Sequence, residues 1–82
     1  MINSIIYVPL LNEGTVVFRP VRVEQINNNI YKILSSDDGS TPEEIDEVWA
    51  YQIDSYVSCV VKIIDGSNIL IANKLLEKGM DF

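Results

Sequence analysis

The sequence predicts an all-β protein, most simply a small, mostly antiparallel barrel of five to six strands. Short segments rich in β-branched and aromatic residues recur along the 82 residues, with turn-forming residues between them. Only two short stretches carry a helical signal. With 48% hydrophobic and 22% charged residues, the composition is that of a folded globular protein. A chain of this length forms one domain, residues 1–82.

The first half of the chain predicts three strands joined by two short connections. Residues 12–15 form the first turn, in which Gly14 takes a positive φ that other residues rarely adopt. Residues 27–29 are three asparagines, and asparagine tolerates the left-handed conformation that tight hairpin turns require. The three strands are expected at residues 4–11, 16–26 and 30–34.

The second of these strands is interrupted by Arg19 and Pro20, where a regular strand is not expected. Apolar residues occupy even positions before this step and odd positions after it, as Phe18 and Val21 illustrate. Because side chains alternate faces with period two, this slip predicts a β-bulge that absorbs one residue. Proline is tolerated at a bulge, since its missing N–H costs no ladder bond there.

The second half begins with a polar segment, residues 35–46, in which a single helical turn is expected. Thr41 is a suitable N-cap and Glu44 completes a capping box. Residues 47–53 then predict a strand with Trp49, Tyr51 and Ile53 on one face.

The last elements predict a hairpin. Residues 56–64 form a strand, Asp65 and Gly66 a turn, and residues 69–72 the returning strand. Residues 67–79 also fit a helix that begins at Ser67 and stops at Gly79. We expect a strand to about Ala72, followed by a short helical or irregular end.

The net charge is −6, and the acids are concentrated in one segment without lysine or arginine. Such a cluster serves either as a solvated loop that keeps the protein soluble or as a docking surface for a basic partner. The balance argues against direct binding to nucleic acids, which depends on contacts to phosphates. The acids of this segment are Asp37, Asp38, Glu43, Glu44, Asp46, Glu47 and Asp54.

Catalysis and metal binding find little support. Cys59 is the only cysteine and there is no histidine, so neither a disulfide nor a zinc site can form within the chain, and no base can activate the thiol. We expect Cys59 to be a structural core residue. The acids lack EF-hand spacing, and no cofactor is expected. Without a signal peptide or an apolar span, the protein is expected in the cytoplasm.

Arginine and aromatic residues each leave two interpretations open. Arg19 and Arg22 either pair with acids such as Glu13, Glu24 or Glu47 or contact a partner. Trp49 and Tyr51 either fill the core or, if half exposed beside the acids, form the centre of a recognition patch.

The stretches VPLLNEGTVVFRPVRVEQI, NNIYKIL and DEVWAYQIDSYVSC resemble a group of small uncharacterised bacterial proteins. In them a V-P-L-L-x-E-G-T-x-V-x-R-P-V motif precedes a tyrosine-containing strand and an acidic E-x-W segment. The resemblance covers residues 7–59 and implies an SH3-like barrel without a known activity.

These observations favour a non-enzymatic protein that binds another, possibly basic, protein. The alternatives are an immunity protein or antitoxin that neutralises a basic toxin such as a nuclease, and a small carboxylate- or cation-dependent enzyme. A homodimer through paired strand edges is also open. Gly14, Arg19 and Pro20 are expected to be structural. The expected contact residues are Asp37, Asp38, Glu43, Glu44, Asp46, Glu47, Trp49 and Tyr51.

Overall fold

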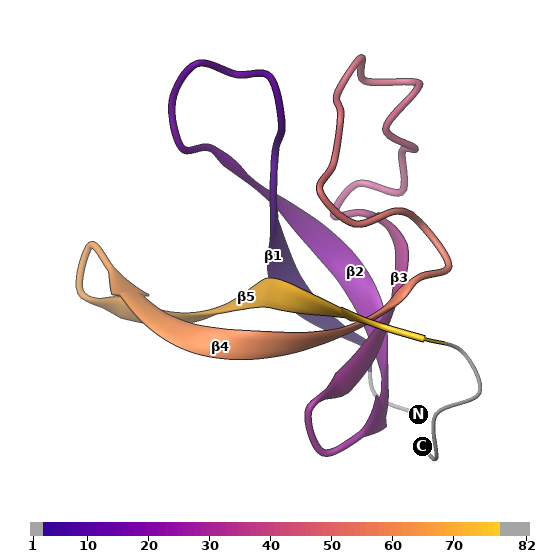
Figure 1. Ribbon diagram of the computed structural model, residues 1–82, viewed down its shortest axis with the longest axis vertical. Helices are drawn as coiled ribbons and strands as arrows, with labels where there is room; N and C mark the ends of the chain where they lie inside the picture. Colours follow the sequence, from indigo (N-terminus) through magenta and orange to yellow (C-terminus); the bar gives the residue numbers. More distant parts are fainter. Residues whose placement is uncertain (1–2, 78–82) are drawn as a thin grey trace.

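The structure, a computed structural model that describes residues 3–77, is a closed barrel of five β-strands (Figure 1). The predicted all-β barrel is confirmed, and the described residues contain no helix. A specific likeness to SH3 domains stays a prediction. The strands are β1 (Asn3–Pro9), β2 (Phe18–Asn27), β3 (Ile30–Ser36), β4 (Tyr56–Ile64) and β5 (Ser67–Leu76).

Each strand pairs with the next one in antiparallel orientation, and β1 closes the barrel against β5. A meander with an odd number of strands brings its first and last strands together in the same direction. The closing pair, Tyr7 with Ile71, is accordingly parallel. Because a parallel pair cannot be joined by a short turn, closure depends on residues from opposite ends of the sequence.

The core lies inside the barrel and follows the period of two expected for strands. In β2, for example, Val21 and Val23 are fully buried while Arg22 is exposed. Every strand contributes, and Trp49 from the long connection between β3 and β4 is the largest member. The buried apolar side chains are Ile6, Val8, Val21, Val23, Tyr31, Ile33, Trp49, Val57, Cys59, Ile71 and Ala72.

The bulge predicted at Arg19 and Pro20 is wrong, because the register between β1 and β2 runs evenly through both residues. The apparent slip arose because Val16 and Phe18 do not point into the core. Val16 is 83% exposed and lies before β2, in the connection where Gly14 has the expected positive φ of 77°, and Phe18 lies on the outer face of β2. The Pro20 carbonyl accepts a bond from Asp37 N–H at 3.1 Å, beyond the end of β3. A missing N–H on that side of β2 therefore removes no ladder bond.

Irregular pairing occurs elsewhere in β2 and β3. The register shifts between Gln25 and Asn27, which leaves Ile26 as an extra residue, and it shifts again opposite Leu34 in β3. The tight connection through the asparagines is confirmed, but none of residues 27–29 has a positive φ. The left-handed conformation that motivated this prediction is therefore not used.

Residues 47–53 do not form the predicted strand. Trp49 makes one isolated bridge with Leu10, and Asp46 and Asp54 on either side have positive φ values of 54° and 70°. The alternation is nevertheless real, since Trp49 is buried and Tyr51 and Ile53 pack against the core. Burial of every second side chain produced the strand-like pattern, although this segment pairs with its neighbours only at that one bridge and so forms no β-strand.

The C-terminal hairpin is confirmed, with Asp65 and Gly66 at φ values of 51° and 80°, as a type I′ turn requires. β5 continues to Leu76, so both the helical alternative and the expected helical or irregular end after Ala72 are wrong up to that residue. Both expectations also reach into residues 78–82, which lie outside the described residues.

Asn29 ends the pairing between β3 and β4. These strands pair only at Tyr31 with Val57 and at Lys32 with Tyr56. Two residues beyond Val57, at Cys59, the Asn29 side chain takes the place of a partner strand. Its Nδ2 donates to the Cys59 carbonyl at 3.0 Å, and its Oδ1 accepts from Cys59 N–H at 3.2 Å. A turn residue thus satisfies both backbone groups of a buried strand residue.

We expect Asn29→Ala to lower the free energy of unfolding by about 1–2 kcal/mol, because both Cys59 backbone groups lose their partner. Urea unfolding measures the loss, and hydrogen exchange at the Cys59 amide should accelerate. Asn28→Ala, one residue earlier in the same turn, is the matched control and should stay within about 0.5 kcal/mol of wild type. Equal effects of the two substitutions would contradict the capping role.

Candidate protein-binding surfaces

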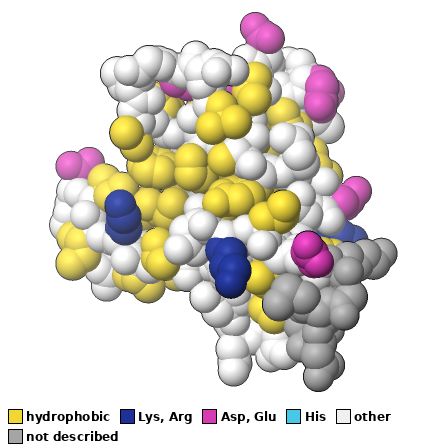
Figure 2. Space-filling model, viewed as in Figure 1, with side chains coloured by type: hydrophobic (Ala, Val, Ile, Leu, Met, Phe, Trp, Pro, Cys, Tyr) yellow, Lys and Arg dark blue, Asp and Glu magenta, His cyan; other side chains and the backbone are white. Residues whose placement is uncertain are grey.

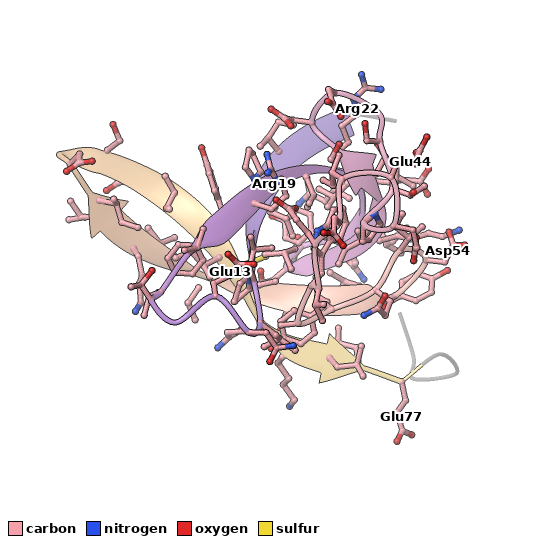
Figure 3. All side chains as sticks on the ribbon, turned by 90° about the horizontal axis from the view of Figure 1, so that it is seen from above. Glu13, Arg19, Arg22, Glu44, Asp54 and Glu77 are labelled. Atoms are coloured by element: carbon pink, nitrogen blue, oxygen red, sulfur yellow. The ribbon has the colours of Figure 1, made fainter. Side chains whose placement is uncertain are left out.

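The predicted acidic segment forms an irregular loop between β3 and β4 (Figure 1), and most of its carboxylates face solvent. Figure 3 shows Glu44 and Asp54 on the outer side of this loop. Asp38 is held in place, since it accepts hydrogen bonds from Ser36 Oγ and, at 3.0 Å, from Ser40 N–H. These bonds stabilise the charged form and lower the pKa of Asp38 to about 2.

The predicted capping box in this loop is formed. Thr41 N–H donates to Glu44 Oε1 at 2.8 Å, and Glu44 N–H donates to Thr41 Oγ1 at 3.2 Å. A bond from Ile45 N–H to the Thr41 carbonyl closes one turn, after which the chain turns away at Asp46. The box therefore fixes the loop locally and leaves Glu43 and Asp46 exposed.

Glu47 joins the loop to the barrel. Its Oε1 accepts from Arg19 Nε at 2.9 Å and from Trp49 Nε1 at 3.0 Å, while its Oε2 accepts from Arg19 Nη2. The Arg19 hydrogen bonds lower the pKa of Glu47, and the same bonds raise the pKa of Arg19. Of the two interpretations of Arg19, the structure shows pairing with an acid, here a bidentate pair between β2 and the loop.

Two residues of the expected contact surface are therefore not available to a partner. Trp49 is 1% exposed and belongs to the core, and the Glu47 side chain is only 12% exposed and already paired. Tyr51 is half buried against the core. The remaining predicted residues, which are exposed, are Asp37, Asp38, Glu43, Glu44 and Asp46.

The structure reveals a second surface, the outer part of the β4–β5 hairpin. β4 and β5 pair at nine positions, but the rest of the barrel holds them only near Val57 and Ile71. The hairpin therefore projects as an arm (Figure 1), residues 60–69. Val61 and Ile63 are 62% and 74% exposed, although they lie on the face that carries Val57 and Cys59 into the core.

The arm also has an open edge. Because the Cys59 backbone groups face Asn29, those of Val61 and Ile63 face the same side by strand alternation. Within residues 3–77 no strand pairs with β4 on that side beyond Val57. Figure 2 shows hydrophobic side chains gathered over the middle of one face of the molecule, with acidic side chains at its margin.

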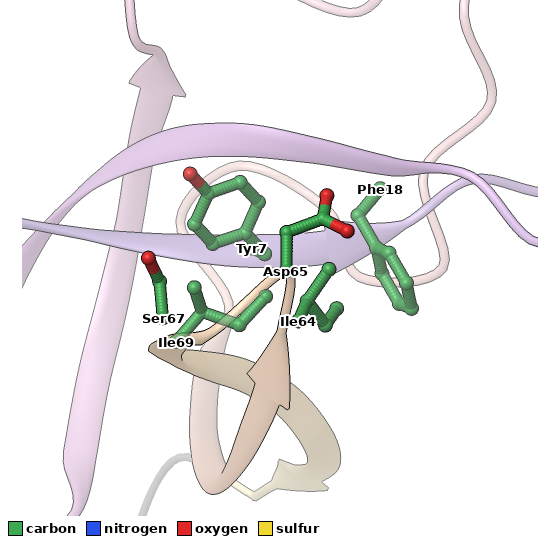
Figure 4. Close-up of a pocket in the computed structure, with 6 residues that line it drawn as sticks. All are labelled: Tyr7, Phe18, Ile64, Asp65, Ser67 and Ile69. Carbon is green, nitrogen blue, oxygen red and sulfur yellow. The ribbon is translucent and has the colours of Figure 1, made fainter.

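A pocket of about 390 Å³ lies where the tip of the arm meets the outer face of β1 and β2 (Figure 4). Tyr7 and Phe18 form one side. The hairpin contributes the other side, with the Asp65 carboxylate directed between the two rings. The hairpin residues that line the pocket are Ile64, Asp65, Ser67 and Ile69.

Cys59 packs in the core, and burial raises the pKa of its thiol to about 11, so the thiol is protonated at neutral pH. Among the residues described, no three cysteine or acidic side chains are grouped so that they could hold a metal ion. A helix long and apolar enough to cross a membrane is likewise absent from residues 3–77. Comparisons of the chain with protein-family models, curated proteins and solved structures find no match.

We expect Glu47→Gln to lower the free energy of unfolding at pH 7 by about 2 kcal/mol, because it leaves the Arg19 guanidinium without its anion. The folded-state pKa of Glu47 lies below the ordinary 4.5. The pair's contribution is therefore complete above pH 4.5 and is lost as the pH falls through the folded-state pKa.

Denaturant unfolding at several pH values from neutral to acidic should show the gap between wild type and Glu47→Gln closing below pH 4.5. Glu43→Gln is the control, since Glu43 is exposed in the same loop. Its effect should be small and should not follow this profile. A gap between wild type and Glu47→Gln that stays constant with pH would contradict an ion-pair contribution.

Proposed function

We propose that this protein is a non-enzymatic module that binds another protein, with the arm as the apolar part of its contact surface. The observation that carries this proposal is the exposure of Val61 and Ile63 on a projecting hairpin. Exposed apolar patches on small globular proteins commonly mark interaction sites. A partner that covered Val61 and Ile63 would extend the apolar face of β4 from the core into the interface with that partner.

The arm offers backbone as well as side-chain contacts. The N–H and C=O groups of Val61 and Ile63 face the open edge, so an extended segment of the partner can add a strand there. Backbone hydrogen bonds then supply affinity, while Val61 and Ile63 supply selectivity for apolar residues. This mode accounts for an edge that is both unpaired and flanked by large aliphatic side chains.

The charge distribution favours a basic partner. The net charge is −6, and six carboxylates of the loop are exposed. A negative field of this kind accelerates encounter with a basic protein and disfavours nucleic acids. We therefore assign steering to the loop and stable contact to the arm.

Replacing Val61 and Ile63 together by threonine should abolish capture of the partner, because the strand-forming tendency remains while the apolar contact is lost. The measurement is capture from native lysate with immobilised wild-type and variant protein, followed by mass spectrometry. Val16→Thr, at an 83% exposed position outside the arm, is the matched control. Both proteins should keep the wild-type unfolding midpoint in urea.

The proposal predicts one protein that wild type and Val16→Thr retain and that the arm variant loses. A protein retained equally by all three would contradict the arm as the contact surface. Analytical ultracentrifugation of the wild type alone tests whether a second copy occupies the edge instead, as a homodimer would.

The exposed acids favour a second, narrower candidate: an immunity protein or antitoxin that covers the basic active site of a toxin. Asp37 and Glu43 are exposed, and hydrogen bonds from Ser36 and Ser40 hold the exposed Asp38 carboxylate in place. An acidic surface with such fixed charge suits the occupation of a cationic catalytic cleft.

For this candidate we expect a basic toxin to be captured at low salt and released at high salt. Replacing Asp37 by Asn and Glu43 by Gln should weaken its capture about tenfold, since each removes one exposed charge without changing shape. Titration with wild type should also abolish the toxin's activity. Captured proteins that are neutral or acidic at both salt concentrations would rule this candidate out.

A further inference from the structure

We infer that the pocket beside the tip of the arm binds the cationic end of a lysine or arginine side chain. The inference deepens the proposed function and rests on it for the source of that side chain, a basic partner docked along the arm. The pocket belongs to neither the acidic loop nor the open edge, so its chemistry is a separate observation.

The walls of the pocket suit a long side chain with a charged end. Tyr7 and Phe18 lie on the outer face of β1 and β2, in pairs that are two steps apart in the register and therefore on the same face: Tyr7 pairs with Pro20, and Pro9 pairs with Phe18. Aromatic faces attract ammonium and guanidinium groups. Ile64 and Ile69, on the opposite side, provide apolar surface for the methylene stem of a lysine or arginine.

The charge in the pocket is a single carboxylate, that of Asp65. Asp65 is the first of the two central residues of the type I′ turn, and Figure 4 shows its carboxylate between the two rings. The ion pairs found among the described residues join Arg19 to Glu47 and Lys32 to Asp54, so the Asp65 carboxylate has no cation of its own there. It is available to a ligand cation.

This composition selects among ligand classes. One carboxylate with two hydroxyl groups, from Tyr7 and Ser67, provides too few anionic ligands for a divalent metal. An anion would meet the negative charge of Asp65. Lys62 shares this face of the arm, since it pairs with Ile69, but it is not among the residues that line the pocket. A monovalent organic cation on an apolar stem matches the remaining features.

The test uses the isolated protein and needs no partner. Amide and side-chain NMR signals are followed during titration with N-acetyl-lysine N-methylamide and, separately, with the arginine analogue. The uncharged N-acetyl-norleucine N-methylamide has an aliphatic side chain without the ammonium group and is the control ligand. We expect saturable shifts at Tyr7, Phe18 and Ile64 with either cationic probe and at least about tenfold weaker binding of the norleucine probe.

Asp65→Asn is the decisive variant, because asparagine followed by glycine also forms a type I′ turn and the hairpin should be retained. It should weaken binding of the lysine probe about tenfold. Asp54→Asn is the matched control: it is also an exposed acid with a positive φ, lies outside the pocket, and should bind as wild type does.

Three results would each overturn the inference: no saturable binding of a cationic probe at its solubility limit, equal binding of the norleucine probe, or unchanged binding by Asp65→Asn. Failure of the proposed function is distinguishable from these. Probe binding that persists while the Val61 and Ile63 variant still captures the partner refutes the arm as contact surface and leaves the pocket in place.

Discussion

The constraint on which the rest of the structure depends is the mismatch in length between one hairpin and the barrel that it completes. β4 and β5 pair at nine positions, whereas β3 reaches β4 at two positions and β1 reaches β5 at one. The surplus cannot be covered by the other strands. The part of the hairpin without neighbouring strands therefore projects as the arm. The open edge and the pocket both result from this extra length of β4 and β5.

Two polar side chains set where the barrel ends and where the acidic loop lies. Asn29 completes the hydrogen bonds of Cys59 and so defines the last covered position of β4. Glu47 receives Arg19 from β2 and the indole N–H of Trp49 while that ring fills the core. A bidentate ion pair and a buried indole thus fix an otherwise irregular connection, and the neighbouring carboxylates remain outside.

Local signals in the sequence were sufficient to locate the five observed strands, the Asp65–Gly66 turn and the capping box, because each depends on neighbouring residues. The strand at residues 47–53 was wrong because alternation reports which side of the chain is buried, not whether a partner strand is present. The bulge at Arg19 was wrong for a different reason: Val16 and Phe18 are apolar but do not point into the core, so they do not mark the core side of the chain. Trp49 could be assigned to the core only once its surroundings were known.

The proposed contact surface was harder to predict than the fold. Charge is visible in composition, so the acidic loop was identified, but the arm depends on how far β3 and β1 extend beside β4 and β5. Apart from Ser58 and Lys62, residues 56–64 are apolar or aromatic, a pattern that fits a fully buried strand equally well. The pocket joins residues from both ends of the sequence, and no local pattern brings Tyr7 and Asp65 together.

The parallel contact between Tyr7 and Ile71 also bears on how the molecule forms during synthesis. Of the five strands, β1 emerges from the ribosome before the others, yet its closing neighbour β5 is the last of the five to be translated. Until then the nascent chain is an incomplete sheet whose inner face, with Ile6 and Val8, has no opposing wall. Closure is therefore a late event that joins distant segments, and a chaperone that binds aliphatic surface would find its target on β1 throughout elongation.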